Sequence, residues 1–177
     1  PWGILSVSVL IAGVFMLTSP AMSRELYEGK LAFDIMRGDN TIGRHVLTFQ
    51  QVDDETHVDI EVSIQVKIGF LTVFRYSHTN REVWRGGRPL SVTTDTDDNG
   101  TPFEVRAEKR DDGFYVQTLA EESLLTPTII PTSYWNSAIL KNLHWFDTQR
   151  GILLEIDLEE GDIERVSLAN GQSIEAR

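Results

Sequence analysis

Four histidines are the residues of this sequence best suited to acid–base or metal chemistry. They are His45, His57, His78 and His144, and they lie on separate segments. A catalytic or metal site would need two or three of them to converge with a carboxylate, and their spacing indicates no such convergence. Each is more simply a strand or surface residue, so the sequence predicts no catalytic residue and no metal ligand.

A calcium-loop pattern is present only in part. Asp95, Asp97 and Asn99-Gly100 match the start of an EF-hand loop, but Arg106 occupies the position of the bidentate acid. A β-hairpin explains these residues better, because Asn-Gly supplies the two positive-φ residues of a tight turn. The sequence contains no cysteine, no serine nucleophile elbow and no glycine-rich phosphate loop. We therefore expect no cofactor.

Aromatic side chains form the strongest candidate for a binding surface. Phe74, Tyr76, His78, Glu82 and Trp84 share parity along one predicted strand, so a regular strand places them on one face. A groove that binds an apolar, lipid-like ligand would use Phe74, Tyr76, His78, Trp84, Tyr134, Trp135 and Trp145. The head of that ligand would be oriented by Arg75, Asn136 or His144. The alternative interpretation is a buried core, the usual place of aromatic side chains.

A long strand must position these residues. From Val58 to Ile68 every even position is apolar and every odd position is polar, which is typical of an antiparallel strand with one covered face. We expect burial of one set, Val58, Ile60, Val62, Ile64 and Val66, and greater exposure of the other, His57, Asp59, Glu61 and Gln65. Gly69 breaks the alternation before Phe70–Trp84, which predicts a second strand or a bulged continuation.

The rest of the chain repeats this strand pattern. Further strands are expected within Glu25–Arg37, Arg44–Val52, Leu90–Asp98, Thr101–Arg110, Phe114–Leu119, Ile152–Leu158 and Asp162–Leu168. Between them, Leu124–Asn136 contains two prolines and many apolar residues, which predicts a loop able to act as a lid, and Ser137–Asn142 predicts one helical turn. The predicted fold is all-β: an antiparallel meander of about seven or more strands that forms a curved sheet, half-barrel or barrel.

The beginning of the chain has a different character. Residues 1–23 contain an uncharged apolar stretch followed by small residues, which predicts a signal peptide, with an uncleaved anchor as the alternative. Residues 24–177 then form a single β-domain that is exported to the periplasm or cell envelope, with membrane contact only through the N-terminal segment. The formal net charge is −11 without a basic run, which excludes nucleic acid as an expected partner.

Several short motifs together resemble a known family. They are Phe70–His78, Glu82-Val83-Trp84, Thr96–Gly100 and Pro131–Asn136. From about Tyr27 onward the sequence is similar to an uncharacterised family of exported bacterial proteins with a domain of unknown function, and more distantly it resembles half-barrel carriers of envelope lipids or lipoproteins. The resemblance implies a signal peptide and a long antiparallel sheet, without an established activity. It also implies further strands after Gly171–Ile174, so we expect the natural chain to continue past Arg177 and the shorter form to associate through an open sheet edge.

Three functions follow from these observations. The first is an exported protein that binds or carries a lipid-like ligand, because export, a curved sheet and an aromatic face occur without catalytic equipment. The second is a structural or interaction protein of the envelope that docks a partner protein through a sheet edge or the proline-containing loop. The third is an enzyme, which would require two histidines and an acid to meet in a cleft.

Overall fold

The computed structural model describes residues 29–126, 128–142, 144–157, 159, 161–167, 171 and 173–176. The predicted signal peptide, residues 1–23, lies outside the described residues. Within the described residues, no helix is long and apolar enough to cross a membrane.

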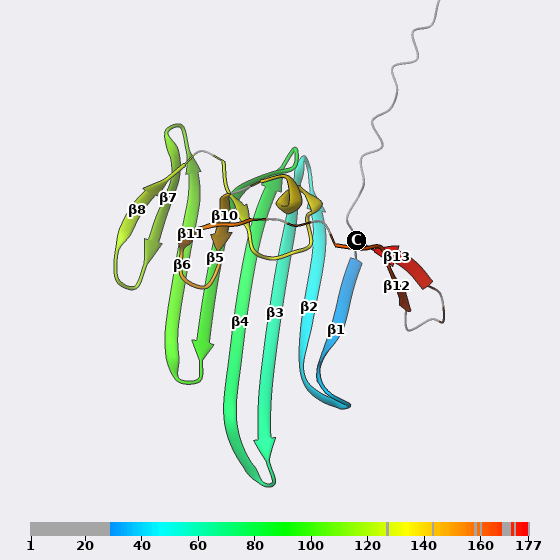
Figure 1. The fold of residues 1–177 in the computed structure, drawn as a ribbon. Coiled ribbons are helices and arrows are strands. Elements are labelled where there is room, and N and C mark those ends of the chain that lie inside the picture. Colours follow the sequence, from blue (N-terminus) through cyan, green and yellow to red (C-terminus); the bar gives the residue numbers. More distant parts are fainter. Residues whose placement is uncertain are drawn as a thin grey trace, which may run out of the picture.

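Eight strands form one antiparallel sheet in which each strand pairs with its neighbour in the sequence, from β1 at one edge to β8 at the other (Figure 1). They are β1 (Gly29–Arg37), β2 (Asn40–Val52), β3 (Glu55–Ile68), β4 (Leu71–Arg85), β5 (Arg88–Asp98), β6 (Thr101–Arg110), β7 (Gly113–Thr118) and β8 (Glu122–Leu125). The prediction of an all-β antiparallel meander is confirmed. The sheet is curved and does not close into a barrel, since β1 and β8 do not pair with each other.

Short turns fix the register of the meander. The predicted Asn99–Gly100 hairpin joins β5 to β6, and both residues have positive φ, 54° and 93°. Gly69 lies in the turn between β3 and β4, so Phe70–Trp84 contains a second strand and not a continuation of the first. Phe70 itself projects from that turn and is 94% exposed.

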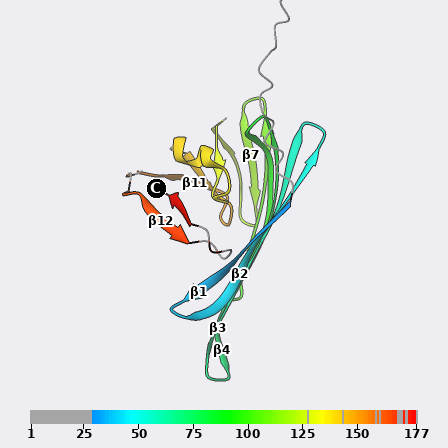
Figure 2. The same ribbon diagram turned by 90° about the vertical axis from the view of Figure 1, so that its right-hand side faces the viewer.

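Burial along β3 follows the predicted parity. Val58 and Ile60 are buried, and Val62, Ile64 and Val66 are half-buried. In the opposite set Glu61 and Gln65 are exposed, and His57 and Asp59 are half-buried, which is more exposed than their neighbours Val58 and Ile60. We call the face that carries Val58 the inner face and the opposite one the outer face. Burial declines toward the β3–β4 turn because only one end of the inner face is covered, as Figure 2 shows.

The cover is a segment of residues 129–142 and 144–149, which we call the covering segment. It contains β9 (Ile130–Pro131), the 3-10 helix η1 (Ser137–Lys141) and β10 (His144–Asp147). The single helical turn predicted at Ser137–Asn142 is therefore present. β10 pairs in parallel with β9 and antiparallel with β11 (Ile152–Glu155), which gives a small second sheet.

The last two strands form a separate hairpin. It consists of β12 (Glu164–Ser167) and β13 (Ser173–Ala176), and it lies on the same side of the large sheet as η1 (Figure 2). The predicted strands at Ile152–Leu158 and Asp162–Leu168 are thus present in shorter form, but they pair with β10 and β13 and not with each other.

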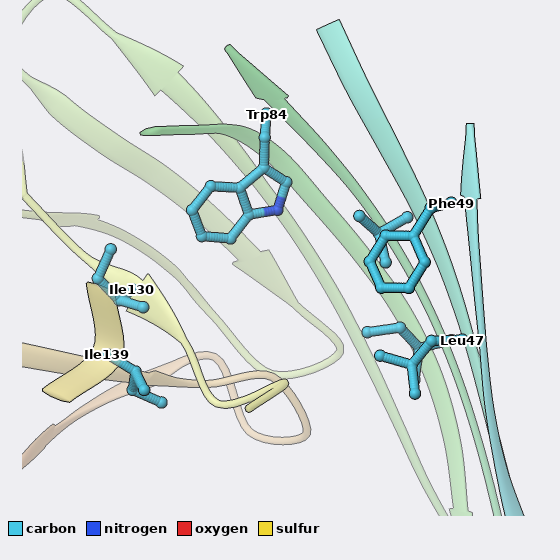
Figure 3. Packing of buried hydrophobic residues seen from close by; sticks show 7 residues of the cluster. Leu47, Phe49, Trp84, Ile130 and Ile139 are labelled. Atoms are coloured by element: carbon cyan, nitrogen blue, oxygen red, sulfur yellow. The ribbon is translucent and has the colours of Figure 1, made fainter. Parts of the chain in front are cut away.

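Two buried clusters join the covering segment to the inner face. The first consists of Leu47, Phe49, Val58, Ile60, Trp84, Ile130 and Ile139, and Figure 3 shows Leu47, Phe49 and Trp84 on the sheet facing the two isoleucines of the covering segment. The second consists of Val92, Val105, Ala107, Phe114, Val116, Ile129 and Phe146. These clusters hold the covering segment at both ends, and the candidate site lies on the same face between the sheet and this segment.

Candidate ligand-binding site

A stripe of polar residues crosses the otherwise apolar inner face. Alternation along β4 and its register with β5 place these residues on one face, and we call them the polar stripe: Tyr76, His78, Asn80, Glu82, Thr94 and Thr96. All are buried except Tyr76, which is half-buried. Buried polar groups are costly without hydrogen-bond partners, so the partners of this stripe reveal how the covering segment is attached.

Glu82 is the most deeply buried member of the stripe, with a fully buried side chain. Its Oε1 accepts a hydrogen bond from Asn80 Nδ2 at 2.8 Å. Its Oε2 accepts three more, from Trp84 Nε1 at 2.8 Å, Trp135 Nε1 at 3.0 Å and Ser133 Oγ at 3.3 Å. Because Ser133 and Trp135 belong to the covering segment, this one carboxylate ties that segment to β4.

Burial raises the pKa of the Glu82 carboxyl above its ordinary value, and the four hydrogen bonds oppose that rise. All four partners are donors, which is the arrangement that an ionised carboxylate accepts. The four hydrogen bonds therefore favour the ionised carboxylate while burial favours the protonated one, and no cation is among the hydrogen-bond partners of Glu82.

The remaining stripe residues make further links. Thr94 Oγ1 donates to the carbonyl oxygen of Thr148 at 2.7 Å, and Tyr76 Oη donates to Gln149 Oε1 at 3.1 Å. His78 Nδ1 lies 2.7 Å from Thr96 Oγ1 within the sheet. The covering segment is thus fixed by directional polar contacts as well as by the two apolar clusters.

A cavity of about 310 Å³ remains between the stripe and the covering segment. We call it the central cavity, and it is lined by His45, Ile60, Val62, Tyr76, His78, Asn80, Thr132, Ser133, Tyr134, Asp147, Thr148 and Gln149. This volume is roughly ten times the ~30 Å³ that a water molecule occupies in the liquid. The central cavity can therefore hold a chemical group of several heavy atoms.

Two residues that line the central cavity each carry a buried side-chain atom without a hydrogen-bond partner among the described residues. These atoms are His45 Nε2 and Asn80 Oδ1. Asn80 is only 3% exposed, and the bond from its Nδ2 to Glu82 fixes the orientation of the amide, since the reversed amide would place two oxygens together. Asn80, a lining residue of the central cavity, thus carries a buried, unsatisfied acceptor of known identity.

The histidines in this wall are neutral at ordinary pH. Burial lowers the pKa of His45. Burial also lowers the pKa of His78, an effect that Asp147 opposes and His45 reinforces. A neutral imidazole has one donor and one acceptor nitrogen, so each ring can interact with a group that both donates and accepts.

Beyond the covering segment the inner face is open and apolar. Phe33 is 52% exposed, and the other members of this open apolar surface are half-buried: Ile35, Ile64, Val66 and Phe74. Cross-strand register places it directly beside the central cavity, since Phe33 pairs with His45 and Ile64 pairs with Tyr76. A polar cavity therefore continues into an apolar surface on a single face of the sheet.

The seven residues predicted to bind a ligand, which we call the aromatic set, lie in two different environments. Tyr76, His78 and Tyr134 line the central cavity, and Phe74 lies on the open apolar surface. Trp84, Trp135 and Trp145 instead belong to, or pack against, the buried cluster, where the rings of Trp84 and Trp135 meet edge to face at 4.9 Å. Both interpretations of the aromatic set thus apply, each to a different part.

The predicted head-orienting residues lie elsewhere. Arg75 has outer-face parity and is exposed, Asn136 Oδ1 accepts a hydrogen bond from the backbone N–H of Ala138 at the start of η1, and His144 is exposed in β10. The polar wall is built by residues that the sequence analysis did not select: Asn80, Thr132, Ser133, Thr148 and Gln149. Parity alone could have found Asn80, because it lies between His78 and Glu82 on the same face.

Two histidines and an acid do line one cavity, namely His45, His78 and Asp147. The Asp147 carboxylate is already engaged by the backbone N–H groups of Gln149 and Arg150 and by the Arg150 guanidinium. Among the described residues, no three histidine or acidic side chains lie close enough together to hold a metal ion.

Sequence comparison supplies the family. Residues 33–177 match the family described as Domain of unknown function (DUF6134). The chain belongs to this family. No curated protein and no solved structure matches it. The predicted membership in an uncharacterised domain family is confirmed, and the match covers all eight strands of the large sheet from Phe33 in β1 onward.

A second hollow, of about 840 Å³, lies near the β3–β4 turn of this DUF6134 domain. Its lining combines exposed outer-face polar side chains, namely Ser63, Gln65, Arg75, Ser77 and Asp97, with Ile64, Phe74 and Tyr76 of the inner face. The outer-face part is open and solvated, so it provides little desolvation for a ligand, and Ile64 and Phe74 already belong to the open apolar surface beside the central cavity. The central cavity is therefore the better candidate site.

Proposed function

We propose that this protein is an exported envelope protein that binds or carries an amphipathic, lipid-like ligand on the inner face of its sheet. The observation that carries the proposal is the continuity of the central cavity with the open apolar surface. The polar head of such a ligand would fill the central cavity, and its apolar tail would cover the open apolar surface. A polar ligand alone would leave the apolar surface exposed, and an apolar ligand alone would leave the polar atoms without hydrogen-bond partners. The apolar N-terminal stretch of the sequence supports export.

The geometry favours binding over catalysis. Two hydroxyl–base contacts lie near the central cavity, Thr96 with His78 and Ser133 with Glu82. Thr96 is 1% exposed and does not line the cavity, and a nucleophile must reach its substrate. Ser133 does line the cavity, but the carboxylate oxygen that it contacts at 3.3 Å is shared with the indole N–H groups of Trp84 and Trp135. The polar wall is suited to recognising a ligand.

A matched pair of variants on β3 tests the proposal. Ile64→Lys places a charge on the open apolar surface, and Ser63→Lys places the same charge on the outer face one residue away. We expect Ile64→Lys to reduce binding of the apolar fluorophore N-phenylnaphthylamine and of co-purifying lipid by about tenfold or more, because burying an unpaired charge beside a tail is costly. Ser63→Lys should bind as the unmodified protein does.

Fluorescence titration and native mass spectrometry of the two variants provide the measurement. Circular dichroism first checks that both variants fold. Equal binding by the two variants, or no binding by the unmodified protein, would contradict the proposal.

A second candidate function is docking of an envelope protein along the edge strand β1. Three of its side chains are large, apolar and about half exposed: Leu31 at 49%, Phe33 at 52% and Met36 at 52%. Edge strands with such side chains recruit additional strands. Under this alternative, substituting Ala32, which pairs with Val46 of β2, with Pro would abolish partner capture without changing fluorophore binding.

A further inference from the structure

The chemistry of the central cavity restricts the head group of its ligand. We infer that this head group is uncharged and bears hydroxyls, as in a monoacylglycerol or another neutral polyol amphiphile. The inference rests on the proposed function and adds the ligand class. It follows from which groups in the wall are unsatisfied and which are already paired.

An unsatisfied acceptor requires a donor on the ligand. Asn80 Oδ1 is buried without a partner, and the bond from Asn80 Nδ2 to the Glu82 carboxylate prevents the amide from presenting its N–H groups instead. An unmet buried acceptor is destabilising until a donor reaches it. A hydroxyl hydrogen meets this need, whereas a carboxylate or phosphate oxygen would place a second acceptor against Asn80.

The charges around the central cavity disfavour an anion. No lysine or arginine lines it, and its wall contains Asp147. Asn80 in turn is hydrogen-bonded at 2.8 Å to the Glu82 carboxyl group, which offers no cation either. An anionic head would therefore be desolvated beside the Asp147 carboxylate without a lysine or arginine of the lining to pair with it.

The two acids in and next to this wall, Asp147 and Glu82, are also not available to a cation. Four donors already surround Glu82, which is fully buried. Asp147 is occupied by two backbone N–H groups and by Arg150. An ammonium head would enter a site in which every carboxylate has its partners, so it would lose hydration without gaining an ion pair.

The neutral histidines complete the match. His45 Nε2 has no partner, and among the described residues His78 uses only Nδ1, toward Thr96. A hydroxyl both donates and accepts, so vicinal hydroxyls can satisfy an imidazole nitrogen in either tautomer as well as the acceptor of Asn80. The same face then continues through Phe33 and Ile64, where an acyl chain would lie.

A series of amphiphiles with one tail and four heads tests the inference. The probes are monododecanoylglycerol, dodecanoate, dodecyl phosphate and dodecylammonium, each below its micelle concentration, with affinities measured by displacement of N-phenylnaphthylamine from the unmodified protein. We expect the glycerol head to bind at least about tenfold more tightly than any charged head, the discrimination that one unpaired buried polar group provides.

A histidine pair locates the effect. His45→Phe removes the unpartnered nitrogen while keeping a ring of similar size, and His57→Phe makes the same change on the outer face. We expect His45→Phe to lower the preference for the glycerol head several-fold and His57→Phe to leave it unchanged. The head-group series on the unmodified protein needs no variant, so the inference stays testable if His45→Phe does not fold.

The outcomes separate this inference from the proposed function. Tighter binding of a charged head, together with loss of binding in Ile64→Lys, overturns the head-group inference and leaves the proposed function intact. An unchanged preference in His45→Phe also overturns the inference, because the head would then bind outside the central cavity. If none of the four amphiphiles binds, both the inference and the proposed function fail.

Discussion

The two buried clusters under the covering segment solve the same packing problem with different chemistry. One of them, which we call the Phe146 cluster, is made of apolar side chains. Its members are Val92, Val105, Ala107, Phe114, Val116, Ile129 and Phe146. The other cluster surrounds Trp84, which donates a hydrogen bond to the Glu82 carboxylate. We call this cluster, together with Glu82 and its four hydrogen-bond donors, the Glu82 cluster. Both clusters lie on one face of one sheet, and both bury side chains of the covering segment.

The difference is visible within a single cross-strand row. The row runs through Phe49, Val58, Glu82, Val92, Ala107 and Val116, and Glu82 is its only charged member. Apolar contacts are non-directional, so the Phe146 cluster provides burial without selecting one placement of the covering segment. Hydrogen bonds to a fixed carboxylate do select a placement, and that placement leaves the central cavity beside them.

The largest expected effect is on the Phe146 cluster. Phe146→Ala should lower the free energy of unfolding by about 3–5 kcal/mol, because a fully buried ring is lost and a cavity remains. Urea unfolding followed by tryptophan fluorescence measures the loss. Phe70→Ala, at a turn position that is 94% exposed, is the control and should change stability by about 0.5 kcal/mol or less. A small effect of Phe146→Ala would mean that this cluster does not hold the covering segment.

A shape-preserving change tests the Glu82 cluster. Glu82→Gln keeps the volume but turns an N–H group toward donors, so we expect a loss of about 1–3 kcal/mol in unfolding free energy. Glu61→Gln on the exposed outer face is the matched control and should be nearly neutral. Thermal and urea unfolding measure both. If Glu82→Gln is as stable as the unmodified protein, the four donors do not depend on the charge.

The pH dependence of the same pair sharpens the comparison. Burial raises the pKa of folded Glu82 above its ordinary value of 4.5, so between these two values the folded state holds a proton that the unfolded state has lost. The stability advantage of the unmodified protein over Glu82→Gln should therefore decrease as pH rises from 4.5. The pKa values of His45 and His78 are lowered from 6.5 in the folded state, so both proteins also lose stability as the pH falls below 6.5. This loss is the same in the two proteins and cancels in the difference between their stabilities. An advantage that grows with pH would contradict this prediction.

The smallest expected effect is the removal of one methyl group from the Phe146 cluster. Ile129→Val should cost about 0.5–1.5 kcal/mol, because Ile129 is 1% exposed and belongs to that cluster of buried apolar side chains. Equilibrium urea titrations of the two proteins measure this change in the free energy of unfolding. An isosteric change at Glu82 should thus cost more than a lost methyl group at Ile129, and the reverse order would show that the two clusters do not differ in the way proposed.

Much of the fold follows from local rules that the sequence displays directly. Alternation along Val58–Ile68 predicts which face of β3 is covered, and the Asn99–Gly100 turn predicts one hairpin and its register. The same alternation places Tyr76, His78, Glu82 and Trp84 on one face. These features depend on neighbours in the chain, because strand geometry and turn chemistry act over a few residues.

The sequence by itself determined an all-β antiparallel meander, one helical turn at Ser137–Asn142 and a shared face for Phe74, Tyr76, His78, Glu82 and Trp84 of β4. Only the tertiary structure decided that Trp84 belongs to the core with Trp135 packed against it, that the Glu82 carboxylate holds Ser133 and Trp135, and that His45 and His78 lie on either side of Val62 in one cross-strand row. The physical reason is that these contacts join residues far apart in the chain, and neither parity nor composition specifies where a covering segment packs on a sheet.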